Sequence, residues 1–303
     1  MVLKRVGLTG ATGMLGTHIR SLFQESNIDI ISISRPSPTN NDIEWDLSEW
    51  KSIEFFDSIF SDAQAIIHAG AIVDPGNSTN EKKMYDANVR SCLNLGEWAL
   101  LRDIPIIYIS GAIVYEDTFK LFQNEKAKLG WNGYGGFYGF SKLLAEDIFM
   151  RLKQKGLKIS ILRPTSIYGT GMPVNSLVSK FLIKASNDET IEISEPVEDG
   201  VDLIHALDVA RAIMNIVIKQ KWRVYNLSSG DPISIKKLAQ SCINLSDSGR
   251  IKVLGTVDKN YIPSSRYSLD TNLAKKDLNW SSKIDINLGL KMIKNKKFKS
   301  ETL

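Results

Sequence analysis

Short apolar runs alternate along the chain with longer amphipathic segments, and each pattern predicts its own kind of element. Five apolar runs rich in Ile and Val are typical of strands buried on both faces: 5–9, 28–34, 63–69, 104–110 and 157–163. Three longer segments between them are expected to be helices: 13–25, 80–102 and 136–155. The alternation of strand and helix predicts an α/β fold with a Rossmann-type, doubly wound parallel sheet.

The alternation becomes less regular after residue 164, where prolines separate shorter elements. The elements expected there are helices near 176–187, at 206–219 and from Ile235, and a strand within 223–229. We expect a Rossmann domain over residues 1–164 and a smaller substrate-binding α/β region over residues 165–303. No Gly/Ser-rich linker separates the two parts, which favours an interleaved arrangement.

The composition is that of an ordinary globular protein, with 43% hydrophobic and 24% charged residues. The net charge of +4 is scattered rather than gathered in one patch, so no nucleic-acid partner is expected. The basic tail 291–303 is interpreted as a solvated or frayed terminus. No apolar run reaches the roughly 18 residues that span a bilayer and no signal peptide is recognised, so no membrane partner is expected. Cys92 and Cys242 lack metal-ligand neighbours, which favours a reducing cytoplasmic location and no metal site.

Three glycines in a GxxGxxG frame follow the first expected strand and open the first expected helix. Glycine permits the tight turn, lets backbone N–H groups approach a pyrophosphate and lets the helix pack on the sheet. The expected cofactor-binding loop and first helical turn comprise Gly10, Thr12, Gly13, Met14, Leu15 and Gly16. A glycine-rich turn without a ligand is the alternative, but the flanking strand and helix favour nucleotide binding.

The end of the second expected strand carries Ser34 and Arg35. NAD-binding proteins commonly have an acidic residue at this point, which holds the ribose diol of the adenosine. A carboxylate would repel a 2′-phosphate, whereas a serine and a guanidinium would bind one. We therefore favour NADP as the cofactor, with NAD possible if Arg35 is only a surface residue.

Tyr138 and Lys142 lie four residues apart in the expected helix 136–155 and therefore share one of its faces. A tyrosine with a pKa near 10 is a poor acid–base at neutral pH. A nearby lysine and a positive nicotinamide ring would lower that pKa, so that the phenol exchanges a proton with a sugar hydroxyl. A surface Tyr–Lys pair is the alternative, because the spacing alone is common.

Further motifs occur in a fixed order along nearly the whole chain. They are TGATGMLG (9–16), WDLSEW (45–50), IIHAGA (66–71), YGFSK (138–142), LRPTSIYGTG (162–171), DLIHALDVARA (202–212) and RYSLDTNLAKKDLNW (266–280). Together they resemble the extended short-chain dehydrogenase/reductase family, the NAD(P)-dependent epimerase/dehydratase group that acts on nucleotide sugars.

The resemblance implies roles for individual residues. Tyr138 would be the acid/base, and Lys142 would bind the nicotinamide ribose and tune Tyr138. The other cofactor contacts that it implies are Asp46 and Leu47 beside adenine, Ala69, Gly70 and Ala71 on the next strand, Asn88, and the backbone of Pro164 and Thr165. It also implies a homodimer through the helices near 80–102 and 136–155.

The family usually has Ser or Thr where this chain has Gly111. That hydroxyl positions the substrate oxygen, and its absence can cost on the order of a hundredfold in rate. Three explanations stay open. Ser110 takes over as a catalytic residue, another group such as Tyr115 or the substrate itself fills the role, or the enzyme is slowed or inactive.

Substrate contacts are less well defined. Ser166 stands where the family often has an asparagine that touches the substrate phosphate. Arg266 or Lys259 is expected to grip the nucleotide diphosphate, and Lys180 is either a further phosphate contact or part of a solvated helix face. The resemblance places His205 at a structural corner, and Asp208 is expected to be the acidic residue at a helix N-terminus.

The leading hypothesis is an NAD(P)-dependent oxidoreductase or epimerase of a nucleotide-activated sugar. Arg35 favours a 4-keto-sugar reductase. Ala112 and Ile113 replace the acidic pair of the family's dehydratases, which disfavours dehydration. The alternatives are a reductase of a non-sugar carbonyl and a catalytically weakened NADP(H)-binding regulator.

Overall fold

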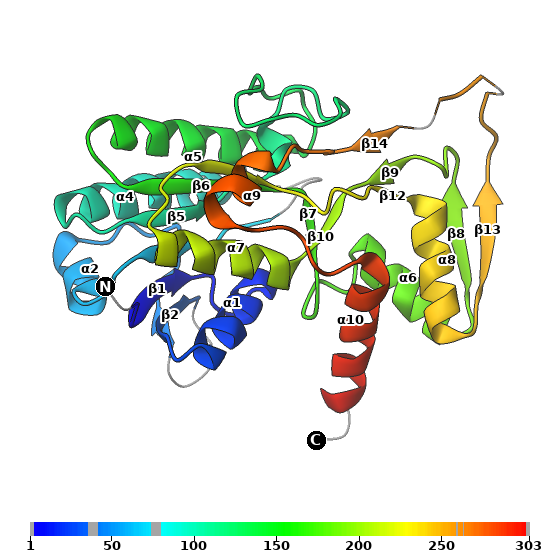
Figure 1. The fold of residues 1–303 in the computed structure, drawn as a ribbon, viewed down its shortest axis with the longest axis horizontal. Helices are drawn as coiled ribbons and strands as arrows, with labels where there is room; N and C mark the ends of the chain where they lie inside the picture. The colour runs from blue at the N-terminus through cyan, green and yellow to red at the C-terminus, as the bar shows by residue number, and fades with distance from the viewer. Residues whose placement is uncertain (1–2, 36–41, 74–79, 259, 263, 301–303) are drawn as a thin grey trace.

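A parallel sheet of seven strands forms the larger part of the molecule (Figure 1). The computed structural model describes residues 3–35, 42–73, 80–258, 260–262 and 264–300. The strands lie in the order β11-β6-β5-β4-β1-β2-β3, and their bounds are β1 Arg5–Thr9, β2 Asp29–Ser34, β3 Ile43–Glu44, β4 Ile66–His68, β5 Ile106–Ile109, β6 Ile159–Pro164 and β11 Val224–Leu227. The predicted doubly wound α/β fold is confirmed.

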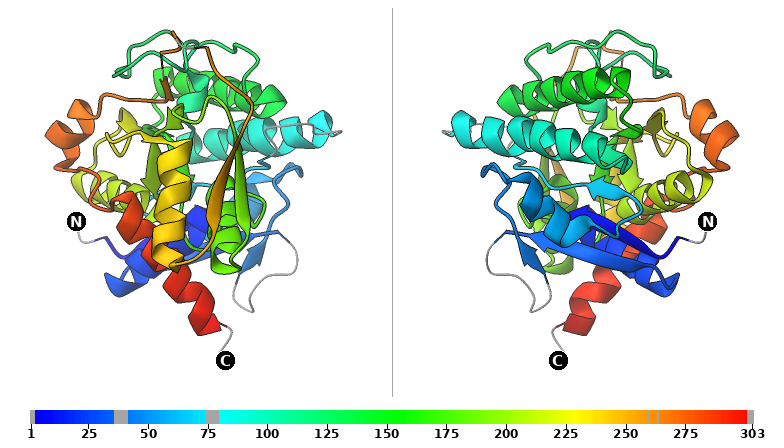
Figure 2. Two further views of the ribbon diagram at one scale, coloured as in Figure 1. Left: turned by 90° about the vertical axis from the view of Figure 1, so that its right-hand side faces the viewer. Right: turned by 90° about the vertical axis from the view of Figure 1, so that its left-hand side faces the viewer.

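Helices cover both faces of this sheet, and each face has its own apolar cluster (Figure 2). One face packs against α1 (Met14–Glu25), α7 (Ala206–Lys219) and α9 (Asn272–Leu278). The other face packs against α2 (Ile53–Phe60), α4 (Ser91–Leu101) and α5 (Gly136–Gln154). Burial on both faces explains why the strands read as continuous apolar runs instead of alternating ones.

The segment 80–102 is not one regular helix. Helix α3 (Glu81–Tyr85) passes through a π-helical segment, Asp86–Arg90, into α4. Within the π-helical segment the Asn88 amide contacts other elements: it accepts from Ile72 N–H (2.8 Å) and donates to Ile72 O (2.9 Å) and to Ser141 Oγ (3.1 Å). Such a widened turn is frequent at functional sites, and apolar periodicity does not reveal it.

The smaller region is built on α6 (Leu177–Ser186) and α8 (Ile235–Ser246), on the right of Figure 1. Its strand pairs are β8 (Thr190–Ser194) with β13 (Arg250–Leu254), β7 (Ser166–Tyr168) with β10 (Leu203–His205), and β9 (Gly200–Val201) with both β12 (Ile233–Ser234) and β14 (Ser265–Arg266). Strand β11 and helices α7 and α9 return from the later half of the chain to the large sheet. The boundary between residues 164 and 165 stays a prediction.

The expectation of a frayed basic tail is wrong for most of its length. Residues Ile286–Ser300 form helix α10. Ile286, Leu290 and Ile293 recur at helical spacing, and the last two are buried against the α6–α8 cluster. The lysines of this segment concealed the short apolar stripe in the sequence. Among the described residues, no helix is long and apolar enough to cross a membrane.

Candidate active site

The glycine loop lies at the point where the strand order reverses, since β1 is flanked by β2 and β4. Gly10 has φ +72°, and a Cβ there would lie 2.7 Å from the backbone of Gly70. A Cβ on Gly16 would overlap the carbonyl oxygen of Gly10. The backbones of β1, β4 and α1 thus approach each other more closely than side chains would allow.

The amino end of α1 can receive an anion. Gly13 provides no side-chain cap and the first turn, which starts at Met14, contains no acidic residue. The first N–H groups of a helix lack partners within the helix and attract phosphate. Thr12 is exposed beside them, and Leu15 is buried in the core. The loop therefore fits the pyrophosphate of a dinucleotide.

The predicted adenine-side residues gather along the same crevice. A Cβ on Gly70 would lie 2.7 Å from Leu47 Cδ1, so Leu47 reaches the crevice from the β3 side. Ala69 and Ala71, on either side of Gly70, are partly exposed there. Asp46 precedes Leu47 and pairs with Lys83 across 3.5 Å. The sequence gave no signal for Lys83.

Ser34 and Arg35 occupy the end of β2. The Ser34 hydroxyl donates to the carbonyl oxygen of Arg35 at 3.1 Å, and this serine is only 4% exposed. The Arg35 side chain is exposed. Arg35 is therefore the better placed of the two for contact with a phosphate, because the Ser34 hydroxyl is turned to its own backbone.

His68 is a buried hub that the sequence analysis did not single out. Gly70 N–H donates to Thr9 Oγ1 (3.1 Å), which lies 2.8 Å from His68 Nδ1, and His68 Nε2 lies 3.4 Å from Ser91 Oγ. The Ser91 hydroxyl donates to the Ala87 carbonyl oxygen at 2.6 Å. These partners assign the proton of a neutral ring to Nε2. Burial, helped by the charge of Lys142, lowers the pKa of His68 to about 3.

Tyr138 and Lys142 lie on one face of α5, as their spacing predicts. Lys142 is 4% exposed, and its Nζ donates to the Ile109 carbonyl oxygen at 2.8 Å. The same Nζ lies 5.8 Å from the centre of the Tyr138 ring and 4.9 Å from that of Tyr108. The carboxyl end of β5 thus holds the lysine beside the tyrosine.

The expected lowering of the tyrosine pKa is not produced by the chain itself. Burial raises the pKa of Tyr138 to about 12, and burial lowers the pKa of Lys142 to about 8. The amine of Lys142 is directed to a backbone carbonyl, and desolvation outweighs its effect on the phenol. A lower pKa for Tyr138 therefore requires the positive charge of a bound oxidised nicotinamide.

Ser110 is poorly placed to act as the positioning hydroxyl. It is 5% exposed, and its Oγ donates to Glu146 Oε1 at 2.5 Å. Glu146 is in turn paired with Arg163 at 2.6 Å. Neighbouring side chains of an extended strand point to opposite faces, and Ser110 points into the protein. The geometry argues against the catalytic role that we assigned to Ser110.

Tyr115 is committed in the same way. Its hydroxyl donates to Asn226 Oδ1 at 2.6 Å and accepts from Arg163 Nη1 at 3.1 Å, and the residue is fully buried. Neither of the two candidate protein hydroxyls therefore replaces the one missing at Gly111.

Gly111 itself has room for a side chain. Its φ of −179° is extended backbone that any residue adopts. A Cβ there would lie 3.6 Å from Ile113 Cγ2 and 3.9 Å from the carbonyl oxygen of Pro164, which are ordinary contacts. The glycine is thus a chemical departure that the backbone does not require.

A model of the NAD dependent epimerase/dehydratase family matches residues 6–228. This match includes the glycine loop, the Tyr138–Lys142 pair and six of the seven central strands in full, together with most of the seventh. The chain belongs to the NAD-dependent epimerase/dehydratase family. It is an enzyme of the extended short-chain dehydrogenase/reductase type.

Similar proteins cover most of this family member. The dTDP-4-dehydro-6-deoxyglucose reductase of Escherichia coli is 27% identical over 318 aligned positions, which cover 95% of this chain and 96% of that protein. A putative UDP-glucose 4-epimerase of Methanocaldococcus jannaschii is 26% identical over 246 positions, covering 76% and 79%. The structure of MoeE5 in complex with UDP-glucose and NAD has a TM-score of 0.82 at 21% identity, covering 98% of this chain and 99% of that one.

The nicotinamide-side residues of this epimerase/dehydratase lie at the carboxyl end of β6. Pro164 ends the strand, and Thr165 follows with its backbone N–H bonded to Leu227 O at 2.9 Å. The Thr165 hydroxyl donates to Asp202 Oδ1 at 3.0 Å, so it is already occupied. Ser166, in β7, is partly exposed.

The other two predicted substrate residues lie in different surroundings. The Arg266 guanidinium lies between the rings of Phe119 and Tyr134, 4.0 and 4.4 Å from their centres. This arginine lines a hollow of about 420 Å³ within the segment 116–134. Lys180 is exposed on α6, in agreement with a solvated helix face. Lys259 lies outside the described residues.

His205 and Asp208 have structural surroundings at the start of α7. His205 Nδ1 accepts from Leu207 N–H at 3.2 Å, and its ring lies edge-on to Tyr168. The Asp208 carboxylate accepts from the backbone N–H groups of Lys283 and Ile284, both at 3.0 Å. Among the described residues no group of His, Cys, Asp and Glu is arranged to hold a metal ion.

Replacing His68 by glutamine should reduce the acid sensitivity of the fold. The unfolded chain takes up a proton near pH 6.5, but the folded protein accepts it only near pH 3. The stability that this histidine contributes is therefore complete above about pH 6.5 and falls as the pH drops towards 3. At pH 5 the loss is about 2 kcal/mol.

Urea unfolding of the wild type and of His68→Gln at pH 7 and pH 5 measures this difference. The wild type should lose about 2 kcal/mol more between the two pH values than the variant, which cannot titrate at this position. An equal loss in both proteins would show that His68 is not held neutral.

Proposed function

We propose that the protein transfers a hydride between a nicotinamide cofactor and a carbon atom of a nucleotide-activated sugar. The observation that carries this proposal is the Tyr138–Lys142 pair at the carboxyl end of the sheet that bears the glycine loop. The named relatives act on nucleotide sugars, and the MoeE5 structure contains UDP-glucose and NAD. A dinucleotide bound along the loop would supply the hydride acceptor or donor.

The residues of the chain supply the proton chemistry and the orientation. Tyr138 gives or takes the proton of the substrate oxygen, and Lys142, held by Ile109 O, places its amine beside the phenol and the nicotinamide ribose. The Lys142 amine is half charged near pH 8. Protonated Lys142 favours tyrosinate, so its charge assists proton removal most below that pH.

Among the reactions of this family we propose reduction of a 4-keto sugar with NADPH. Arg35 is exposed at the strand end that faces the adenosine ribose, and the Escherichia coli reductase aligns with nearly the whole chain. Ala112 and Ile113, in the short 3-10 turn after β5, provide no acid–base group for dehydration. An epimerase that keeps NAD⁺ is the second candidate, because the Methanocaldococcus jannaschii relative carries that name.

Mass spectrometry of the dinucleotide released from purified, denatured protein tests the cofactor. We expect NADP(H), or an empty site that binds added NADPH. Arg35→Ala should weaken NADPH binding about tenfold and leave NADH binding unchanged, because a charge-assisted contact to the 2′-phosphate is lost. Retained NAD⁺ together with an unchanged Arg35→Ala variant would reject the NADP proposal and favour the epimerase.

Gly111→Ser should raise turnover with a 4-keto nucleotide sugar about ten- to a hundredfold, because it restores a hydroxyl where there is room for one. Gly111→Ala is the matched control, since it adds the same Cβ without the oxygen and should show no gain. Initial rates of both variants at saturating NADPH measure the effect. A fall in both variants would show that the active site uses the empty space at Gly111.

We further propose a homodimer through the face made by α3, α4 and α5. Three large apolar side chains are exposed there: Tyr85 (41%), Leu101 (58%) and Met150 (39%). Light scattering should give twice the 33.8 kDa of the chain. Leu101→Lys should shift the protein towards monomer, whereas Ile218→Lys, on α7 at the opposite face of the sheet, should not. A monomeric wild type would reject the proposal.

A further inference from the structure

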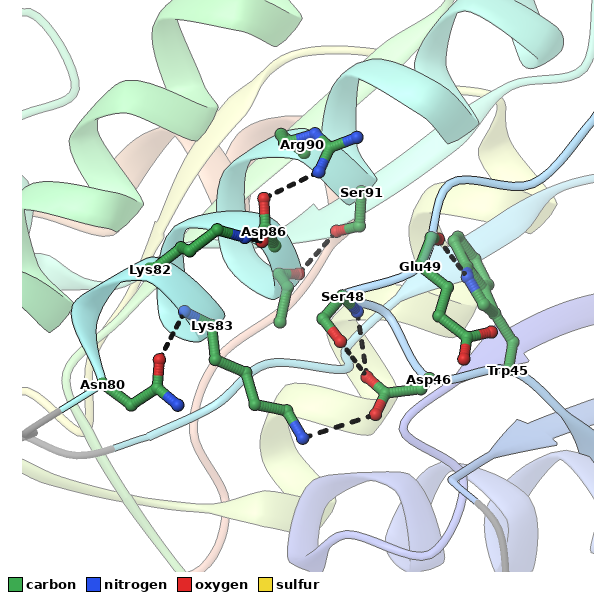
Figure 3. Close-up of polar contacts among 11 residues, drawn as sticks. Trp45, Asp46, Ser48, Glu49, Asn80, Lys82, Lys83, Asp86, Arg90 and Ser91 are labelled. Carbon is green, nitrogen blue, oxygen red and sulfur yellow. Dashed lines mark hydrogen bonds and ion pairs between the residues drawn. The ribbon is translucent and has the colours of Figure 1, made fainter.

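An ion pair connects two elements that approach the cofactor crevice from different strands. Asp46 follows β3, and Lys83 lies in α3, which follows β4 along the chain. Lys83 Nζ is 3.5 Å from Asp46 Oδ2, and Figure 3 shows the lysine extended towards the carboxylate. We call this ion pair the Lys83–Asp46 strap.

The acidic end of the strap is held in one orientation. Asp46 Oδ1 accepts from the backbone N–H of Ser48 at 2.9 Å and from its hydroxyl at 2.8 Å, which leaves Oδ2 for Lys83 (Figure 3). Partial burial alone would raise the pKa of Asp46. The Ser48 hydrogen bonds and the Lys83 charge outweigh burial and bring this pKa below its ordinary value. Asp46 is therefore a fixed anion at neutral pH.

The basic end of the strap is held by the helix. Asn80 caps α3, and its Oδ1 accepts from the backbone N–H of Lys83 at 2.9 Å. The preceding residue, Lys82, pairs instead with Asp86 within its own helix at 2.7 Å. Two adjacent lysines thus have different partners, and only Lys83 among them reaches across to the β3 side (Figure 3).

The strap lies beside the place where the adenosine end of a dinucleotide is expected. Leu47, the residue after Asp46, approaches Gly70, and Gly70 approaches Gly10 of the glycine loop. In sheets of this kind the ligand lies in the crevice at the carboxyl ends of the strands. Asp46 and Lys83 therefore close one end of that crevice from opposite sides.

We propose that Lys83 is a cofactor-retention residue, whose ion pair with Asp46 must open before the dinucleotide can leave. The proposal rests on dinucleotide binding in the crevice, which is part of the proposed function. The side chains of Lys83 and Asp46 are 46% and 24% exposed, so water screens their attraction in part. The expected effect on release is accordingly moderate, about two- to fivefold.

Stopped-flow energy transfer from tryptophan to NADPH or NADH, whichever the wild type binds more tightly, measures association and release separately. Lys83→Met should speed release about two- to fivefold and change association less than twofold, since the strap acts on the bound state. Lys82→Met is the matched control, because it removes an equal charge one residue away and should leave both rates unchanged. Equal release from wild type and Lys83→Met would overturn the proposal.

The Asp46→Asn background shows whether Lys83 acts through Asp46. Lys83→Met should then have no further effect on release, because the partner of the lysine is already absent. A persistent acceleration in this background would mean that Lys83 contacts the dinucleotide directly, which would also overturn the strap. A wild type that binds neither dinucleotide would reject the proposed function together with the strap, whereas normal binding with unaltered release would reject the strap alone.

Discussion

The buried ion pair between Arg163 and Glu146 joins the parts of the molecule that surround the catalytic helix. The two side chains are 4% and 2% exposed and lie 2.6 Å apart. Arg163 also donates to the Tyr115 hydroxyl and to the Glu125 carbonyl oxygen, both at 3.1 Å. Removal of one partner of such a pair leaves an uncompensated buried charge and costs about 3–5 kcal/mol. The segment after β5, strand β6 and helix α5 therefore keep their relative positions only while both charges are present.

This constraint decides which groups are left for chemistry. Glu146 lies one helical turn beyond Lys142, and Lys142 one turn beyond Tyr138, so a single face of α5 carries both the anchor and the acid–base pair. The Ser110 hydroxyl completes the hydrogen bonding of Glu146 and is lost to the substrate. Tyr138 and Lys142 remain, and burial biases both towards their neutral forms. A site with these biases responds strongly to the positive charge of an oxidised nicotinamide.

The sequence predicts what depends on local pattern and fails where distant segments meet. The glycine loop and the Tyr138–Lys142 spacing are local features, and the structure brings them to the same edge of the sheet. The contact of Ser110 with Glu146 joins residues 36 positions apart, and no periodicity reveals it. The same holds for His68, whose partners lie on β1 and α4, and for Lys83, whose partner follows β3. Ile293 was missed for another reason: its short apolar stripe lies among lysines, so packing and not composition decides its fate.

Gly111 then appears as a consequence of where the other hydroxyls went. In a site with a free neighbouring hydroxyl, a glycine at this position would be compensated. Here Ser110 and Tyr115 both donate into the network around the Arg163–Glu146 pair, so neither can turn towards the substrate without leaving a buried acceptor unsatisfied. The backbone at Gly111 is extended and the space beside it is open towards Ile113 and Pro164. The substrate must therefore either orient its own oxygen against Tyr138 or react slowly, and the fold itself imposes neither outcome.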